Sequence, residues 1–74
     1  MTTPKYERVA SAIRAQIRSG ELRPGDQLPT TQGLIEHYGV SYGSVRTALL
    51  ILKAEGLIEG RQGEGVFVRE QSDR

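Results

Sequence analysis

The 74-residue chain has no cysteine and no tryptophan, and it contains only one phenylalanine and one histidine. Without cysteine it can form no disulfide bridge and no thiolate zinc site, and it has no thiol nucleophile. His37 alone is too few ligands for a metal, so we expect no metal and no cofactor. No apolar run approaches the ~20 residues of a membrane span, and no signal peptide is apparent at the start. These absences predict a small cytoplasmic protein that binds a partner and is not an enzyme.

An excess of charge of one sign is also missing. Ten Lys and Arg residues against nine Asp and Glu residues leave a formal net charge of +1. The charge is unevenly distributed, because residues 1–18 hold four basic side chains and one acidic side chain. A basic first segment can follow a phosphate backbone, or it can be the solvated face of a helix. Charge alone leaves both interpretations open.

Glycine and proline divide the chain into short elements of one small domain. Apolar spacings of three and four predict helices, and β-prone runs on either side of a glycine-rich loop predict a hairpin. The predicted elements are helices over 4–19, 30–38 and 41–55, a very short strand at 27–28, and strands at 57–59 and 66–68. Thr3-Pro4 fits the start of the first helix, and Thr30 and Ser41 fit the caps of the next two. The domain should therefore cover residues 1–70, and residues 71–74 should form a tail or the start of a linker.

The apolar pattern also predicts which side chains are buried. We expect Tyr6, Tyr38 and Phe67 in the core, since each lies within an apolar stripe or strand. Leu50 points about 140° away from Val45 on the third helix, and therefore away from that stripe. Together with Ile51 it could contact a second protomer, another domain, or thymine methyl groups. The sequence does not separate these three alternatives.

Only three residues, Gly39-Val40-Ser41, separate the second and third predicted helices. Two helices joined by such a turn form a helix-turn-helix unit, whose second helix can enter the major groove of DNA. An ordinary helical hairpin has the same turn but does not explain the glycine-rich hairpin that follows. The expected fold class is therefore α+β, a winged helix-turn-helix in which the hairpin is the wing.

Specific motifs extend this prediction over about residues 5–69. They are PGDQLPT at 24–30, GVS at 39–41, Val45-Arg46, Ala48-Leu49, Leu52, EGLI at 55–58 and RQGEGVFV at 61–68. In content and order they resemble the GntR family of bacterial transcription regulators. The resemblance implies the N-terminal DNA-binding domain of a regulator, which we expect to be a repressor. It also implies the third helix in the major groove and the wing at the minor groove of double-stranded DNA.

The resemblance further implies an assembly. Family members usually carry a C-terminal domain that binds a small effector and often dimerises. A homodimer formed through a segment outside these 74 residues would recognise an operator with dyad symmetry, whereas this chain alone should be mainly monomeric. The alternative function is a winged helix that binds protein, and Arg46 and Arg61 argue against it because such a module needs no cations there.

Carried over position by position, the resemblance gives a set of candidate DNA contacts. They are Thr30, Thr31, Gln32, Ser41, Tyr42, Gly43, Ser44, Arg46, Arg61, Gln62 and Gly63. Arg46 matches an arginine that the family retains, whereas Gln32 and Tyr42 stand where the family usually has arginines. Tyr42 could instead cover the edge of the core. Losing two guanidinium groups predicts a different operator, weaker binding per domain and a weaker dependence on salt. Glu64 is unfavourable beside phosphates unless it accepts from a cytosine amino group or faces away.

Overall fold

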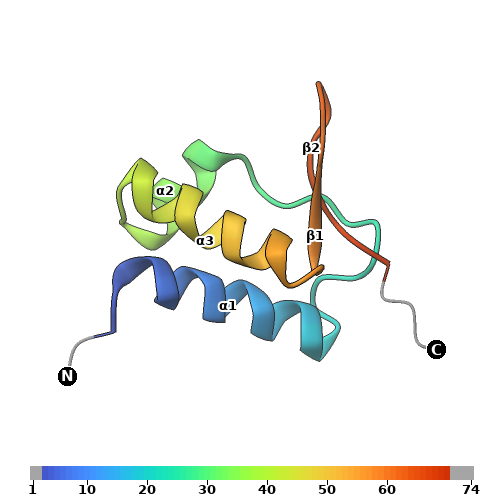
Figure 1. Cartoon of the computed structure of the whole chain (residues 1–74), viewed down its shortest axis with the longest axis horizontal. Coiled ribbons are helices and arrows are strands. Elements are labelled where there is room, and N and C mark those ends of the chain that lie inside the picture. Colours follow the sequence, from blue (N-terminus) through green and yellow to red (C-terminus); the bar gives the residue numbers. More distant parts are fainter. Residues whose placement is uncertain (1–2, 71–74) are drawn as a thin grey trace.

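The computed structural model describes residues 3–70, which form three helices followed by a two-stranded antiparallel sheet (Figure 1). The elements are α1 (Lys5–Ser19), α2 (Thr31–Tyr38), α3 (Tyr42–Ala54), β1 (Ile58–Arg61) and β2 (Gly65–Val68). α1 runs alongside α3, and the hairpin rises from the end of α3 on the side away from α1 (Figure 1). This is the predicted winged helix-turn-helix, and the hairpin is its wing. The tail expected at 71–74 lies outside the described residues.

The helix boundaries follow from capping groups. Thr30 and Ser41 are the N-caps of α2 and α3, and their hydroxyl oxygens accept hydrogen bonds from the backbone N–H groups of Gly33 (3.0 Å) and Ser44 (3.2 Å). Both predicted caps are confirmed. Gly39 ends α2 with a φ of +65°, a left-handed conformation that glycine adopts without a steric cost. The chain can therefore reverse within three residues and begin α3.

The start of α1 differs from the prediction. Pro4 itself is the N-cap, and its carbonyl accepts from the backbone N–H groups of Glu7 (3.0 Å) and Arg8 (3.1 Å). No side chain caps this end, so Thr3 does not have the predicted role. Because proline has no N–H group to satisfy, the helix can begin directly after it.

The segment between α1 and α2 attaches the wing to the helices. The N–H groups of Leu28 and Val68 donate to the carbonyls of Val66 and Asp26, each over 2.8 Å, and Gln27 is bridged to Phe67. The very short strand predicted at 27–28 is thus reduced to an isolated β-bridge at Gln27, which lies beside β2. The Gln27 side chain also donates to the carbonyl of Glu64 (2.8 Å), which ties the tip of the wing to the same segment.

The strand register decides which wing residues face the core. Ile58 is paired with Val68, and both are buried. Successive side chains of a strand point to opposite faces, so Phe67 must face outward next to a buried Val68. It is half-buried and lies outside the core, and the predicted core position of Phe67 is therefore wrong. Its ring instead supports the guanidinium group of Arg61, with the central carbon 4.3 Å from the ring centroid.

One apolar core joins all the elements. Its buried members are Val9, Ala10, Ile13, Leu28, Leu34, Val40, Val45, Ala48, Leu52, Ile58 and Val68. Tyr6 and Tyr38 pack against it as predicted. Within residues 3–70, no helix is long and apolar enough to cross a membrane. One face of α3 does not pack in the core, since Leu52 has no exposed surface whereas Leu50 is 54% exposed.

This division of α3 predicts opposite effects for two leucine truncations. Leu52→Ala should lower the free energy of unfolding by about 2–5 kcal/mol, because it opens a cavity in a core that supplies only about 3–5 kcal/mol. Leu50→Ala should change it by less than about 0.5 kcal/mol. Urea titration followed by circular dichroism measures both values, and equal losses would contradict the assigned faces of α3.

An ion pair holds the end of α3 against α1. The Arg14 guanidinium donates to both carboxylate oxygens of Glu55, over 2.9 and 2.8 Å. This hydrogen bonding lowers the pKa of Glu55 from its usual value of 4.5 and raises the pKa of Arg14. The carboxylate therefore stabilises the fold above about pH 4.5, and this contribution is lost as the pH falls through the lowered pKa.

Removing the arginine should remove this dependence on pH. Arg14→Gln should lower the melting temperature at pH 7, and its difference from the wild type should shrink as the pH approaches 3. Arg8→Gln, on an exposed part of the same helix, is the matched control. Thermal melts at the two pH values test this, and a constant difference would contradict the role of the pair.

Candidate nucleic-acid interface

The exposed face of α3 and the wing enclose a shallow hollow of about 190 Å³. It is lined by Thr31, Tyr42, Arg46, Leu49, Leu50, Lys53 and Val66, and we call it the α3–wing hollow. A second hollow of about 250 Å³ shares Thr31, Leu49 and Val66 with it and continues along the wing to Glu64. The start of α2, the outer face of α3 and the wing therefore form one continuous surface.

Four α3 residues on this surface share one side of the helix. Tyr42, Arg46, Leu50 and Lys53 are spaced by four, four and three residues, which places them on a single face. Tyr42 is 57% exposed, so the alternative that it covers the core edge is wrong. Among residues 3–70, the Arg46 guanidinium has no hydrogen-bond or ion-pair partner. It is available to a ligand outside the domain.

Other predicted contacts already have a role within the fold. Thr30 and Ser41 cap their helices, and the Ser41 hydroxyl also lies 3.2 Å from that of Ser44. The Gln32 amide donates to the carboxylate of Glu36 over 3.2 Å. Gly43 is exposed in the first turn of α3. These polar groups can therefore bind a ligand only through donors and acceptors that are not already used within the domain.

The wing carries the remaining predicted residues. Arg61 lies on its outer face, with its Nε atom 3.0 Å from a carboxylate oxygen of Glu59 and its guanidinium over the ring of Phe67. Gln62 and Gly63 are exposed at the tip. Arg61 is thus held in place before any ligand arrives, and Glu59 balances part of its charge. The structure does not bring Arg61 into the α3–wing hollow, whose cations are Arg46 and Lys53.

Lys53 is a site residue that the sequence reasoning missed. A side chain at Gly60 would approach its ammonium nitrogen to 3.3 Å, so Lys53 extends from α3 to the wing across space that Gly60 leaves open. The signal was present in the sequence, because Lys53 follows Arg46 by seven residues and therefore lies on the same helix face. The approach to Gly60, however, depends on the position of the wing.

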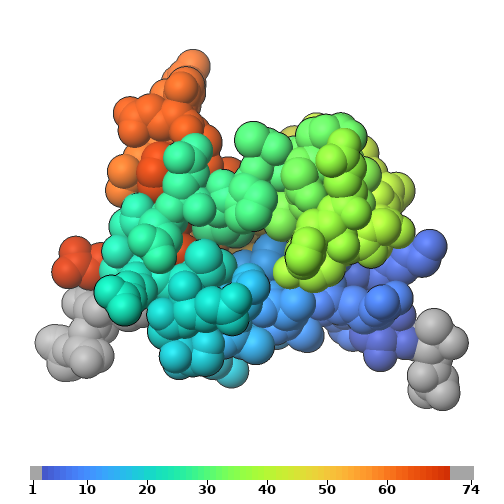
Figure 2. Space-filling model, turned by 180° about the vertical axis from the view of Figure 1, so that it is seen from behind, coloured from blue at the N-terminus to red at the C-terminus, as the bar shows by residue number. Residues whose placement is uncertain are grey.

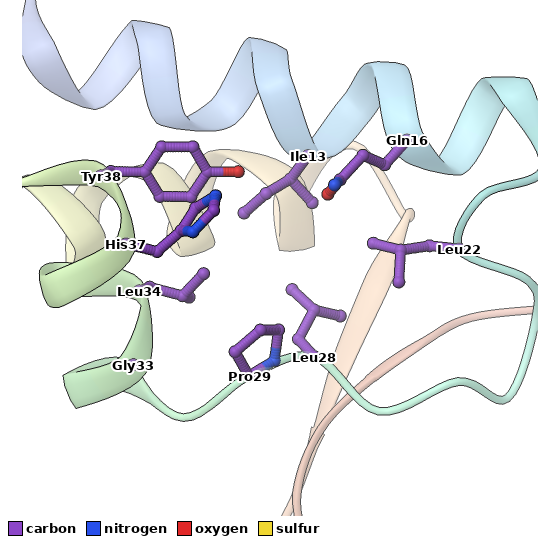
Figure 3. A pocket seen from close by; sticks show the side chains of 9 residues that line it. All are labelled: Ile13, Gln16, Leu22, Leu28, Pro29, Gly33, Leu34, His37 and Tyr38. Atoms are coloured by element: carbon purple, nitrogen blue, oxygen red, sulfur yellow. The ribbon is translucent and has the colours of Figure 1, made fainter.

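A larger cavity of about 340 Å³ lies between α1, α2 and the connecting segment (Figure 3). Gln16, His37 and Tyr38 provide its polar groups, and its other lining residues are Ile13, Leu22, Leu28, Pro29, Gly33 and Leu34. Burial, with a smaller effect of the Glu21 charge, raises the pKa of Tyr38. No lysine or arginine lines this cavity, so it lacks the cations that phosphates require. Figure 2 shows the molecule from behind, with α1 along the lower side, α2 above it and the wing projecting upward at the other end.

Comparison with known proteins decides what kind of domain this is. A family model described as "Bacterial regulatory proteins, gntR family" matches residues 5–68, which is nearly all of the described chain. The chain belongs to the gntR family. The resemblance noted in the sequence motifs is thereby confirmed, and the matched family is one of regulatory proteins and not of enzymes.

Individual gntR-family relatives are similar over most of this chain. The mannosyl-D-glycerate transport/metabolism system repressor MngR of Escherichia coli K12 is 46% identical over 68 residues, which cover 92% of this chain and 28% of the relative. The regulator LutR of Bacillus subtilis is 52% identical over 54 residues, which cover 73% of this chain and 25% of the relative. The chain thus spans about a quarter of the length of these relatives.

Solved structures of gntR-family domains have the same fold. The AraR DNA-binding domain in complex with operator ORR3 superposes with a TM-score of 0.88 at 35% identity, covering 92% of this chain and 82% of that chain. A putative GntR-family transcriptional regulator gives a TM-score of 0.89 at 42% identity, covering 96% of this chain and 28% of that chain. The winged-helix architecture is therefore shared with domains of known DNA complexes.

Proposed function

We propose that this gntR-family domain binds operator DNA in a sequence-specific manner, with α3 in the major groove and the wing at the minor groove. The observation that carries the proposal is the outer face of α3, where Tyr42, Arg46 and Lys53 are exposed beside the wing. Two cations on one helix face suit a polyanion, and the similar AraR domain has been solved with its operator.

Arg46 is the residue that we assign to base reading. It projects from the outer face of α3, the helix that a helix-turn-helix domain places in the major groove. Its planar guanidinium can donate to both major-groove acceptors of a guanine, and it has no competing partner among residues 3–70. Ser44 and Gly43 lie beside it, and their small size lets the helix approach the DNA closely.

Gln32 and Tyr42 should make this operator different from those of relatives with arginines there. A glutamine can pair with adenine, and a tyrosine hydroxyl can donate to a phosphate. Gln32 must give up or share its hydrogen bond to Glu36 to do so. Thr30 and Thr31, at the start of α2, are assigned to the DNA backbone, which helix N-termini favour.

The wing supplies a contact that depends little on sequence. Arg61, Gln62 and Gly63 approach the minor groove, whose hydrogen-bonding pattern is degenerate and whose attraction for cations is mainly electrostatic. The ring of Phe67 and the carboxylate of Glu59 hold the Arg61 guanidinium in one orientation. This reduces the conformational entropy that Arg61 loses on binding.

The regulator that contains this domain is proposed to be a cytoplasmic repressor. Relatives that carry the word repressor in their names include MngR and the histidine utilization repressor of Klebsiella aerogenes. The relatives are about four times as long as the matched segment, and a homodimer formed through residues outside this domain would require an operator with dyad symmetry.

Arg46→Ala should remove base discrimination. We expect a loss of about 1–3 kcal/mol on the selected operator and a relaxed preference at one or two base pairs, with a smaller loss on a scrambled duplex. Thr47→Ala, an exposed neighbour outside the α3–wing hollow, is the matched control. Fluorescence anisotropy with both duplexes measures these affinities. An equal loss on both would mean that α3 only clamps the backbone.

Arg61→Ala should instead weaken binding on every sequence and lower the salt slope by about one unit. Glu64→Gln should strengthen binding slightly, because it removes an anion near the phosphates. Titrations at two salt concentrations against the operator and the scrambled duplex separate these effects from that of Arg46. If Arg61→Ala changed only the preferred sequence, the wing would read bases and its proposed role would be wrong.

A further inference from the structure

Leu50 is an exposed leucine without a function in the fold or in the proposed contacts. Within residues 3–70, only Leu50 and Tyr42 are large hydrophobic residues with more than half of their surface exposed. Both lie in the α3–wing hollow, and Leu50 stands one helical turn beyond Arg46 on the same face. An apolar side chain therefore sits beside the arginine to which base reading is assigned.

We infer that Leu50 recognises the methyl group of a thymine in the major groove and is a specificity-determining residue of this domain. The inference rests on the proposed function, since it requires α3 in the major groove. Thymine alone presents a methyl group there, and apolar side chains are the ones that contact it. Such a contact removes apolar surface of both partners from water.

The charges around Leu50 favour DNA over a protein as its partner. Arg46 and Lys53 flank it along α3, and no acidic residue lines the α3–wing hollow. A second copy of this chain placed symmetrically would bring these cations against each other and would have to desolvate them. A DNA duplex supplies phosphates for the cations at the same time as it offers a methyl group to the leucine.

The spacing along α3 predicts where that thymine lies. Leu50 is four residues beyond Arg46, which corresponds to about 6 Å along the helix axis. Successive base pairs are about 3.4 Å apart, so a helix lying along the groove places the thymine about two base pairs from the base that Arg46 contacts. The operator should therefore contain a thymine on either strand at this distance in each half-site.

The test begins with selection of binding sequences by the 74-residue protein from a library of random duplexes. Each thymine of a selected half-site is then replaced by deoxyuridine, which lacks the methyl group but keeps the hydrogen-bonding groups. One replacement should weaken binding by the wild type about fourfold, as expected for one buried methyl group, and should not affect Leu50→Ala. Thr47→Ala, the control on the same helix, should keep the sensitivity of the wild type.

Several results would overturn the inference, and one of them would also overturn the proposed function. If deoxyuridine has no effect at any position, or weakens the wild type and Leu50→Ala equally, Leu50 does not read a thymine. Leu50→Ala could instead abolish self-association in sedimentation without changing the response to deoxyuridine. That result would place Leu50 in an interface between two copies of the chain. If the wild type enriches no sequence at all, the proposed function itself fails. Thermal melts of Leu50→Ala that match the wild type exclude a folding defect as the cause of any loss.

Discussion

One side of α3 faces the core and the other faces solvent, and the rest of the structure depends on how the side chains of α3 are divided between these two sides. Val45, Ala48 and Leu52 are fully buried on one side of the helix, while Arg46 and Leu50 are exposed on the other. Because 3.6 residues make one turn, fixing the buried side also fixes the direction of the exposed side. The core thus does more than stabilise the domain, since it aims the residues assigned to DNA.

The wing is positioned by a second set of contacts that involves the backbone. The segment at 26–28 pairs with β2, and Gln27 holds the carbonyl of Glu64 at the tip. These bonds connect the wing to the stretch that leads directly into the cap of α2. Displacing the wing therefore requires breaking backbone hydrogen bonds, and the spacing between α3 and the wing is set before DNA binds.

Most of the fold could be predicted from the sequence, because its signals are local. Spacings of three and four, the hydroxyls of Thr30 and Ser41, and Gly39 each act within a few residues. Phe67 could not be placed in this way, since its direction depends on the pairing of Ile58 with Val68 across the hairpin. The N-cap of α1 is Pro4 and not Thr3, and local patterns rarely resolve a difference of one residue.

The candidate site was predictable in part for the same reason. The family motifs indicate Arg46 and the wing tip, and the exposure of Tyr42 agrees with a surface role. The approach of Lys53 to Gly60 and the contacts of Arg61 with Glu59 and Phe67 depend on how separate elements pack. Long-range placement of this kind leaves no pattern in a single sequence.

The separation of faces on α3 also bears on how such a domain can change over generations. A replacement at Tyr42, Arg46 or Leu50 alters the surface without opening a cavity, so it should leave folding nearly intact. An insertion within α3 would instead turn one part of the helix by about 100° relative to the other and bury the wrong side chains. Point substitutions on the outer face are thus an accessible route by which descendants of this chain can acquire new DNA targets. Changes in the length of the helix would instead disrupt the core.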